Sequence, residues 1–168
     1  NSLKAADKLT AANITLTAVN NLTTEAELLA DQKLTLTGGD VTTHKKVTAG
    51  NDMTLTGTNS LKTADEVSAA NITLTGGDVT TQKKVTAGND MTLTANGKLT
   101  AAVLQAQGSI AAAGKDVEMK QQVIAGKDLT MTAANSLTTA DKLTAGGNIA
   151  ASSANGNIDL AAAEAKGV

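Results

Sequence analysis

The sequence has no Trp, Tyr, Phe, Pro, Cys or Arg and a single His among its 168 residues. The lack of Cys excludes disulfides and metal–thiolate sites. The lack of Arg and aromatic side chains, at a net charge of −2, argues against nucleic-acid binding, which needs positive charge and stacking surfaces. No apolar run reaches the roughly 18 residues that a membrane-spanning helix needs. The chain begins at Asn1 in the middle of a repeated pattern, so we expect a piece of a longer protein.

What the sequence does contain is a repeat. An apolar residue within a motif of alternating apolar residues and Thr recurs at intervals of 19 or 20 residues. Two further apolar series keep the same period, one beginning at Leu3 and Leu22 and the other at Leu9 and Leu28. Three apolar positions per repeat, in eight successive repeats, predict a solenoid. The members of the first series are Ile14, Leu34, Met53, Ile72, Met91, Ile110, Leu129 and Ile149.

A single repeat predicts the fold of one coil. Residues 40–58 read DVTTHKKVTAGNDMTLTGT, in which the segments VTT, VTA and MTLT alternate apolar with polar residues. This period of two is typical of strands, and the Gly, Asn, Asp and Lys between the segments suit turns. We therefore predict an all-β parallel β-helix, or β-solenoid, with three short strands in each coil and about 4.8 Å between coils. The predicted coils are 1–19, 20–38, 39–58, 59–76, 77–96, 97–114, 115–134 and 135–154, with 155–168 as a partial coil or the start of the next segment.

The most regular polar feature is a row of T-x-T pairs whose middle residue is expected to point inward. The outward Thr residues would form two parallel rows, interrupted at Ala111/Ala113 and at Ala150/Ser152. One interpretation is that Thr is simply a favourable strand residue that packs along a sheet. The other is a flat ice-binding surface like those of β-solenoid antifreeze proteins. The row consists of Thr15, Thr17, Thr35, Thr37, Thr54, Thr56, Thr73, Thr75, Thr92, Thr94, Thr130 and Thr132.

Charged pairs recur at one turn in three consecutive predicted coils. Asp65 and Glu66 lie between two lysine pairs, so opposite charges are expected to meet between neighbouring coils. The structural interpretation is a surface row of ion pairs that fixes register, each pair contributing at most about 1 kcal/mol. The functional interpretation is a binding site for sulfated glycans or phosphate. The lysines concerned are Lys45, Lys46, Lys83 and Lys84.

Other polar and sulfur-containing residues are expected to be structural. His44 has Gln82 as its counterpart two coils later and is expected to be a solvated turn residue. Gly39 and Gly77 are predicted to be permissive turn glycines. Asp40 and Asp78, which follow them, are predicted to cap turns. Met53 and Met91 are expected to pack in the core.

No candidate catalytic, cofactor-binding or metal-binding residue emerges from the sequence. Polysaccharide lyases and hydrolases with a β-helix fold build clefts from long loops and clustered acidic, basic or aromatic residues. A glycosidase also needs paired carboxylates, and none recurs here on neighbouring coils. We therefore expect a protein that is not an enzyme and uses no cofactor.

Several phrases of the repeat resemble those of filamentous haemagglutinin and its relatives, the exoproteins of two-partner secretion systems and the stalks of contact-dependent growth-inhibition toxins. They are AGNDMTLT at 49–56 and 87–94, AGKDLTMT at 125–132 and AGGNIAA at 145–151. The resemblance covers nearly the whole chain, with a looser fit at residues 97–114 and after 154. It implies a right-handed parallel β-helix, which agrees with the general handedness of parallel crossovers.

The resemblance also implies a location and partners. The protein would be secreted or lie on the outer cell surface of a Gram-negative bacterium, after export by an outer-membrane transporter of a two-partner secretion system. Its function would be that of a structural shaft in an adhesin or toxin stalk. Two alternatives stay open: an ice-binding solenoid, and an adhesin surface that contacts a host or bacterial cell-surface receptor, most plausibly around residues 97–124, where the repeat loosens.

Overall fold

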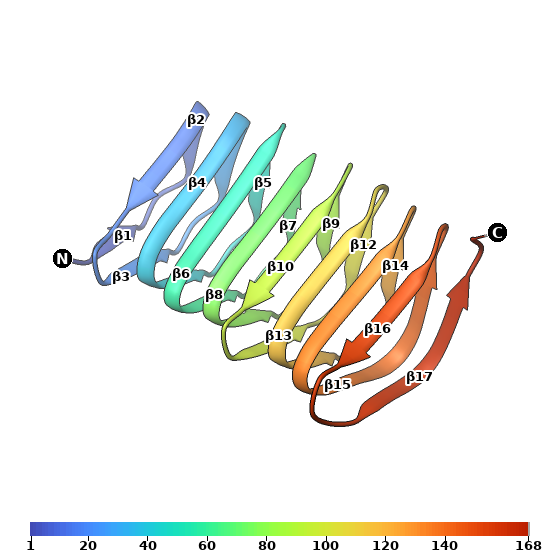
Figure 1. Cartoon of the computed structure of the whole chain (residues 1–168). Coiled ribbons are helices and arrows are strands. Elements are labelled where there is room, and N and C mark those ends of the chain that lie inside the picture. Colours follow the sequence, from blue (N-terminus) through green and yellow to red (C-terminus); the bar gives the residue numbers. More distant parts are fainter. Residues whose placement is uncertain (168) are drawn as a thin grey trace.

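The structure is a computed structural model that describes residues 1–167, and this range consists of strands and turns without any helix. It therefore contains no helix long and apolar enough to cross a membrane. Figure 1 shows a rod of stacked coils with the two chain ends at opposite ends of the rod. The strands are β1 (Leu3–Ala5), β2 (Leu9–Thr17), β3 (Asn21–Thr24), β4 (Leu28–Thr43), β5 (Val47–Ala49), β6 (Asp52–Thr63), β7 (Val67–Ala69), β8 (Asn71–Thr81), β9 (Val85–Ala87), β10 (Met91–Ala95), β11 (Lys98–Ala101), β12 (Leu104–Ala106), β13 (Ile110–Met119), β14 (Val123–Ala125), β15 (Leu129–Ala145), β16 (Ile149–Ser153) and β17 (Ile158–Ala165).

Each coil contributes one row to each of three sheet faces. Face 1 contains Leu3–Ala5 and its equivalents, face 2 contains Leu9–Ala11 and its equivalents, and face 3 contains Ile14–Thr17 and its equivalents. Every pairing between the described strands is parallel, as a β-solenoid requires. The predicted β-solenoid with a period near 19 residues is thus confirmed, as in the pairs Leu22↔Val41 and Leu34↔Met53.

The chain makes eight coils with all three faces and part of a ninth, because face 1 has one more row than face 3. The inward residues of face 1 form a file, meaning a row of equivalent residues along the rod axis. That file is Leu3, Leu22, Val41, Leu61, Val79, Leu99, Val117, Leu137 and Ile158.

Several strands are longer than the sequence predicts. The prediction was three short strands in each coil, but β4 runs through 16 residues, from face 2 of one coil through face 3 into face 1 of the next. The backbone at the corners between these faces is extended enough to keep the hydrogen bonds to neighbouring coils. The segments on the two sides of a corner therefore form one continuous strand. Differences in coil length are absorbed at such corners, where the register shifts between Ala11 and Asn13 and between Gly38 and Asp40.

The core is a thin axial stack of one or two apolar side chains from each face. The middle residues of the T-x-T motifs point inward as predicted, and Leu36, Leu55, Leu74, Leu93 and Met131 are completely buried. Met53 and Met91 are also buried, which confirms their predicted packing role. Alternation along each strand is therefore sufficient to separate core from surface.

One part of the core is polar. The second inward position of face 1 is Thr in several coils, and these side chains are buried. Each of these Thr residues lies two positions after an inward apolar residue, so alternation turns it inward as well. The buried residues of this file that carry a hydroxyl are Thr24, Thr43, Thr63, Thr81 and Thr139.

The loose fit of residues 97–114 to the repeat does not interrupt the stack. β11 pairs with β8 on one side and with β13 on the other, and β12 pairs in the same way with β9 and β14. Small Ala101 and Ala112 occupy the two inward positions where neighbouring coils carry larger residues. The next coil places Met119 and Met131 at the matching positions, and flexible Met side chains are suited to filling such space.

Candidate functional site

The largest uniform surface of the rod is the outward side of face 3, here called the threonine face. It has two files, one through Thr15, Thr35 and Thr54 and the other through Thr17, Thr37 and Thr56, and both continue in register along the rod. The structure places all twelve predicted outward Thr residues in these files, and each is half-buried or exposed. Both files are interrupted at the predicted positions, once at Ala111/Ala113 and once at Ala150/Ser152.

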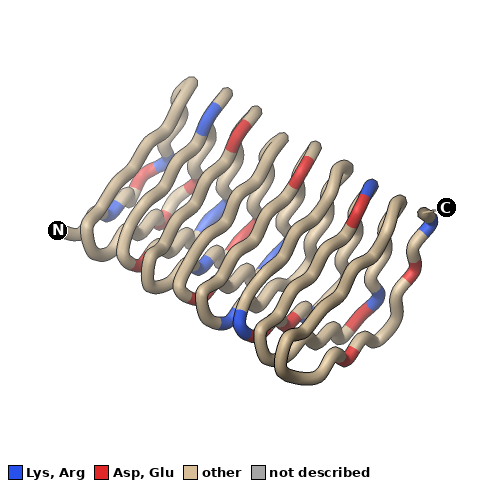
Figure 2. Tube along the Cα trace, in the orientation of Figure 1, with Lys and Arg blue, Asp and Glu red and all other residues tan. Residues whose placement is uncertain are grey.

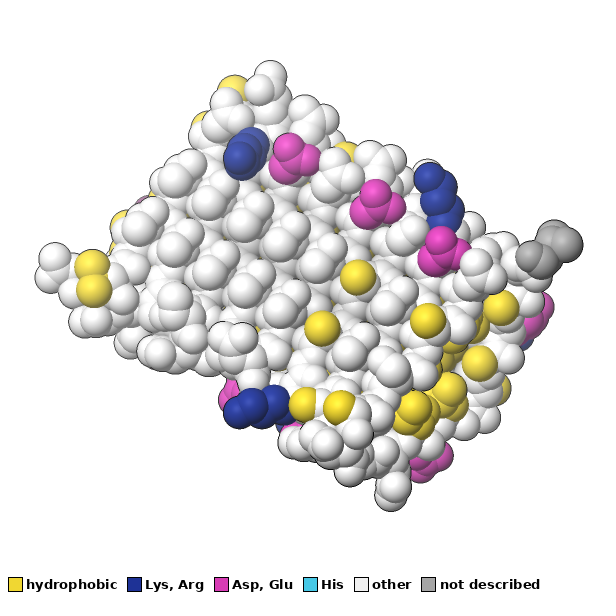
Figure 3. Space-filling view, viewed as in Figure 1, with side chains coloured by type: hydrophobic (Ala, Val, Ile, Leu, Met, Phe, Trp, Pro, Cys, Tyr) yellow, Lys and Arg dark blue, Asp and Glu magenta, His cyan; other side chains and the backbone are white. Residues whose placement is uncertain are grey.

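The threonine face carries no charged side chain at its described outward positions. Figure 2 shows Lys, Asp and Glu at the turns, at the ends of the strands that face the viewer and on the other faces, while the middle of each front strand remains tan. In the space-filling view the same face is a regular lattice of polar side chains with a few hydrophobic ones, and charges lie only at its margins (Figure 3). Such a surface offers many equivalent weak hydrogen bonds but no cavity that would select a small molecule.

The predicted charge contact between coils forms at one of the lysine pairs. Lys46 lies 3.7 Å from Glu66 in the next coil, with both side chains about half exposed. Lys45, Lys83 and Lys84 are exposed at the same turn and make no ion pair with another residue in the range 1–167. Two further pairs, Lys4–Glu25 at 2.9 Å and Lys8–Glu27 at 3.4 Å, extend the contacts toward the N-terminal end. Exposed pairs of this kind stabilise the fold only weakly.

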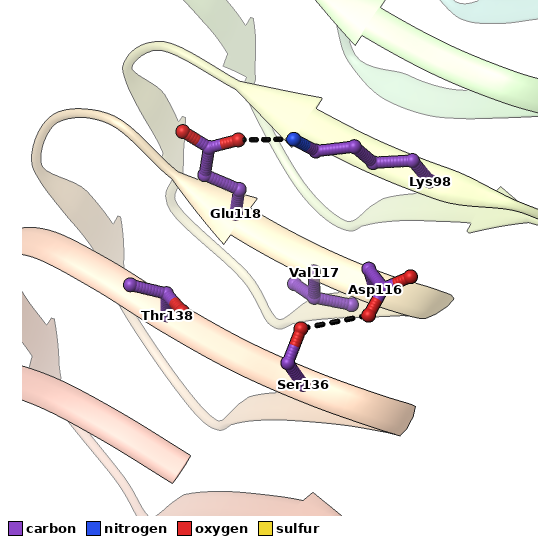
Figure 4. A pocket seen from close by; sticks show the side chains of 6 residues that line it. All are labelled: Lys98, Asp116, Val117, Glu118, Ser136 and Thr138. Carbon is purple, nitrogen blue, oxygen red and sulfur yellow. Dashed lines mark hydrogen bonds and ion pairs between the residues drawn. The ribbon is translucent and has the colours of Figure 1, made fainter. Parts of the chain in front are cut away.

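A second polar feature, which no sequence motif predicts, is a shallow depression of about 360 Å³ on face 1. Lys98 reaches Glu118 of the next coil at 2.6 Å, and the hydroxyl of Ser136 donates to Asp116 at 2.7 Å (Figure 4). It lies within the stretch where the repeat loosens and continues into the following coil. The residues that line it are Lys98, Asp116, Val117, Glu118, Ser136 and Thr138.

The contacts in this depression shift the pKa values of its charged groups. The hydrogen bond and charge of Glu118 raise the pKa of Lys98, and the same hydrogen bond lowers the pKa of Glu118. The hydrogen bond from Ser136 lowers the pKa of Asp116. All these shifts favour the charged forms, so these groups form a set of fixed charges and are unsuited to exchanging protons near neutral pH.

We expect the Lys98–Glu118 pair to make a small contribution to stability that acid removes. The folded pKa of Glu118 lies below its ordinary value of 4.5, so the contribution is complete above that value and is lost as the pH falls through the lowered pKa. Glu118→Gln should therefore reduce the free energy of unfolding at neutral pH by at most about 1 kcal/mol, because the pair is exposed. The difference from the unsubstituted protein should vanish once the pH lies below the lowered pKa of Glu118.

Urea unfolding at several pH values measures this difference. Lys98→Met is the matched control, since it removes the other partner and should give the same pH profile. A difference between Glu118→Gln and the unsubstituted protein that persisted unchanged in acid would show that Glu118 stabilises the fold through packing and not through its charge.

Several aspartates at the corners accept hydrogen bonds from the next coil, and two of them, Asp40 and Asp78, are predicted from the sequence to cap turns. Asp40 accepts a hydrogen bond from the Ser60 hydroxyl at 2.6 Å, and Asp78 accepts one from the backbone N–H of Lys98 at 2.7 Å. The acceptor role of Asp78 toward a backbone N–H resembles the predicted cap, but the capped group belongs to the following coil, whereas Asp40 bonds a side chain and caps no backbone group. The same contact to a backbone N–H of the next coil is made by Asp90 and Asp128.

The glycines before these aspartates have a different role from the predicted one. Neither Gly39 nor Gly77 has a positive φ, so conformational permissiveness is not the reason for glycine there. A Cβ at Gly39 would lie 2.8 Å from the Asn20 carbonyl oxygen, and one at Gly77 would lie 3.0 Å from that of Thr58. Close approach between coils is what requires glycine at these corners.

The remaining polar candidates do not gather into a reactive site. His44 is an exposed turn residue, as predicted. Among residues 1–167, no group of three or more His, Asp or Glu side chains is placed to hold a metal ion. The charged groups of the depression are held in their ordinary ionised forms, and this arrangement gives no general acid or base.

Comparison with protein families gives one match. Residues 120–162 match a family model described as the haemagglutinin repeat, a range that includes β14, β15 and β16 and the first residues of β17. Comparison with curated proteins and with solved structures found no significant match. The strand pairs within the matched range join equivalent positions of the repeat, as do the pairs before it. Val123↔Leu143 lies within the range and Val47↔Val67 before it.

Proposed function

We propose that this chain is a stretch of the shaft of a large secreted bacterial exoprotein, a proposal supported by the haemagglutinin-repeat match at residues 120–162 and by the resemblance of its repeats to filamentous haemagglutinin. The shaft would hold a distal adhesive or toxic domain away from the cell surface. Its function would thus be structural and not enzymatic. The observation that carries this proposal is the continuous stacking of equivalent coils through β1–β17, without an inserted loop.

The proposal includes a location and an export partner. We propose that the parent protein passes through an outer-membrane transporter of a two-partner secretion system and lies outside a Gram-negative cell. The family match supports this context. The fold is compatible with such export because each coil contacts only its neighbours, so coils can form one after another as the chain emerges.

Excision of two coils tests the shaft function. Residues 38–40 and 76–78 both read Gly-Gly-Asp, so deletion of residues 40–77 joins Gly39 to Asp78 and restores the natural junction. We expect the shortened chain to remain a cooperatively folded β-solenoid, about 10 Å shorter along its axis by small-angle X-ray scattering. In the parent protein, export and the activity of the distal domain should persist.

The control is a deletion of residues 40–67, which is not a multiple of the period and breaks the register at the junction, so that the coils on its two sides no longer stack in line. This variant should lose cooperative unfolding and surface display. If the seamless deletion of residues 40–77 abolished adhesion or toxin delivery while leaving folding and export intact, the coils would not be interchangeable and the shaft function would be wrong.

A second candidate function is ice binding by the threonine face. It is favoured by the two files of Thr in register on an uncharged face. The interruption at Ala111/Ala113 divides this lattice and favours the shaft instead. Thermal hysteresis of the purified chain distinguishes the two, and a bulky substitution at Thr73 should abolish any hysteresis that depends on this face.

A third candidate function is direct contact with a cell-surface receptor. The depression at Lys98, Asp116 and Glu118 favours it, since this is where one face departs from the repeat and gathers fixed charges. Receptor contact there would be lost in Glu118→Gln and retained after excision of residues 40–77, whereas a shaft tolerates both changes.

A further inference from the structure

The buried hydroxyls of face 1 form an unusual feature of the core. Thr24, Thr43, Thr63 and Thr81 are register partners in four successive coils. Their exposed fractions are 0, 0, 0 and 2%, and none of their Oγ1 atoms has a hydrogen-bond partner among the described residues. A buried hydroxyl without a partner destabilises a fold, and native structures rarely tolerate several together.

The spacing of the coils explains how these hydroxyls can be satisfied. Equivalent atoms in neighbouring coils of a parallel sheet lie about 4.8 Å apart, which is too far for a direct hydrogen bond. A water molecule at about 2.8 Å from each of two hydroxyls that are about 4.8 Å apart has an angle near 120° at its oxygen. This angle is close to tetrahedral, so the coil repeat is the distance that one water bridges.

We propose that the file from Thr24 to Thr81 binds a row of internal water molecules, one between each pair of neighbouring hydroxyls. Each water would donate to one hydroxyl oxygen and accept from the next, giving a continuous hydrogen-bonded line inside the rod. Buried waters of this kind are structural elements, because they satisfy polar groups that have no partner in the protein.

The rest of the same file supports this assignment. After Thr81 it continues with Ala101 and Met119, both completely buried, so the row of hydroxyls ends at an apolar boundary. It then reaches Thr139, whose Oγ1 accepts a hydrogen bond from the backbone N–H of Ala161 at 3.1 Å. Where a protein donor lies within reach, the buried hydroxyl uses it, and the four stacked Thr residues are those without one.

Substitution of one Thr by the nearly isosteric Val tests the proposal, because the thermal unfolding midpoint should fall if the waters are present and rise if they are not. If waters bridge the file, Thr43→Val leaves the waters on both sides of residue 43 without a partner and lowers the thermal unfolding midpoint by about 2–4 °C. If no water contacts the hydroxyls, the same substitution removes a buried hydroxyl that has no hydrogen-bond partner and raises the midpoint. Thr42→Val is the matched control, because Thr42 lies on the outward side of the same strand and should change the midpoint by less than about 1 °C.

Nuclear magnetic resonance detects the waters directly. With Thr methyl groups labelled, we expect cross-relaxation between long-lived water and the methyls of Thr43 and Thr63, and its loss around residue 43 in Thr43→Val. The proposal is overturned if Thr43→Val raises the midpoint or leaves it unchanged. It is also overturned if the midpoint falls but no water contacts the methyls, because the hydroxyls must then bond to backbone carbonyls.

Discussion

Gly50→Ala should destabilise the solenoid by about 3 kcal/mol, whereas Gly88→Ala should leave its stability unchanged or raise it slightly. The two glycines occupy the same place in identical VTAGND segments, at 47–52 and 85–90. Neither has a positive φ, and each N–H donates to an Ala carbonyl of the preceding coil, Gly50 to Ala30 and Gly88 to Ala69. Local sequence and backbone conformation therefore predict the same effect at both positions.

The different effects of the two substitutions come from the preceding coil, against which each glycine packs. A Cβ at Gly50 would overlap the carbonyl oxygen of Asp31, which is backbone and cannot move without disturbing the ladder. A Cβ at Gly88 would lie 3.5 Å from the Cα of Ala70, an ordinary van der Waals contact. In the preceding coil, the corner that faces Gly50 has three residues, Asp31 to Lys33. The corner that faces Gly88 has only two, Ala70 and Asn71.

Thermal and urea unfolding of the two variants, followed by circular dichroism, measure this difference. For a chain of this size, about 3 kcal/mol corresponds to a decrease of about 6–12 °C in the unfolding midpoint for Gly50→Ala. Each variant serves as the control for the other, since the substituted sequence is identical. Equal effects at the two positions would show that the glycines are required by their local turn and not by the neighbouring coil.

Leu74→Ala should reduce the free energy of unfolding by about 3–4 kcal/mol. Leu74 is completely buried in the file of middle T-x-T residues, between Leu55 and Leu93 of the adjacent coils. The core is only one or two side chains thick at each face, so few neighbours can collapse into the space that a truncated side chain leaves. The cost should accordingly lie in the upper part of the usual range for a Leu-to-Ala change.

The measurement is urea unfolding combined with hydrogen exchange of the backbone amides. Exchange should accelerate most in β6, β8 and β10, because each coil of a solenoid is stabilised by its nearest neighbours. Thr73→Ala is the control on the outward side of the same strand and should cost less than about 1 kcal/mol. An equal loss for Thr73→Ala would mean that the threonine face, and not the axial core, provides most of the stability.

The general form of this protein could be predicted from its sequence. Apolar residues every 19 or 20 positions, with a period of two inside each segment, specify a parallel stack whose inward residues are the repeated Leu, Val, Ile and Met. The two files of the threonine face follow from the same alternation and were predicted residue by residue. The family resemblance is confirmed by a match to residues 120–162.

Contacts between coils were decided only by the tertiary structure. The identical segments around Gly50 and Gly88 differ in their tolerance of a Cβ, and of the four candidate lysines only Lys46 forms an ion pair within residues 1–167. The buried hydroxyls from Thr24 to Thr81 were likewise missed: alternation turns these side chains inward, but their burial without a partner depends on the neighbouring coils. The physical reason is the same in each case. The period sets which residues stack, but the length of the preceding corner sets how closely their atoms approach, and that corner lies about nineteen residues away along the chain.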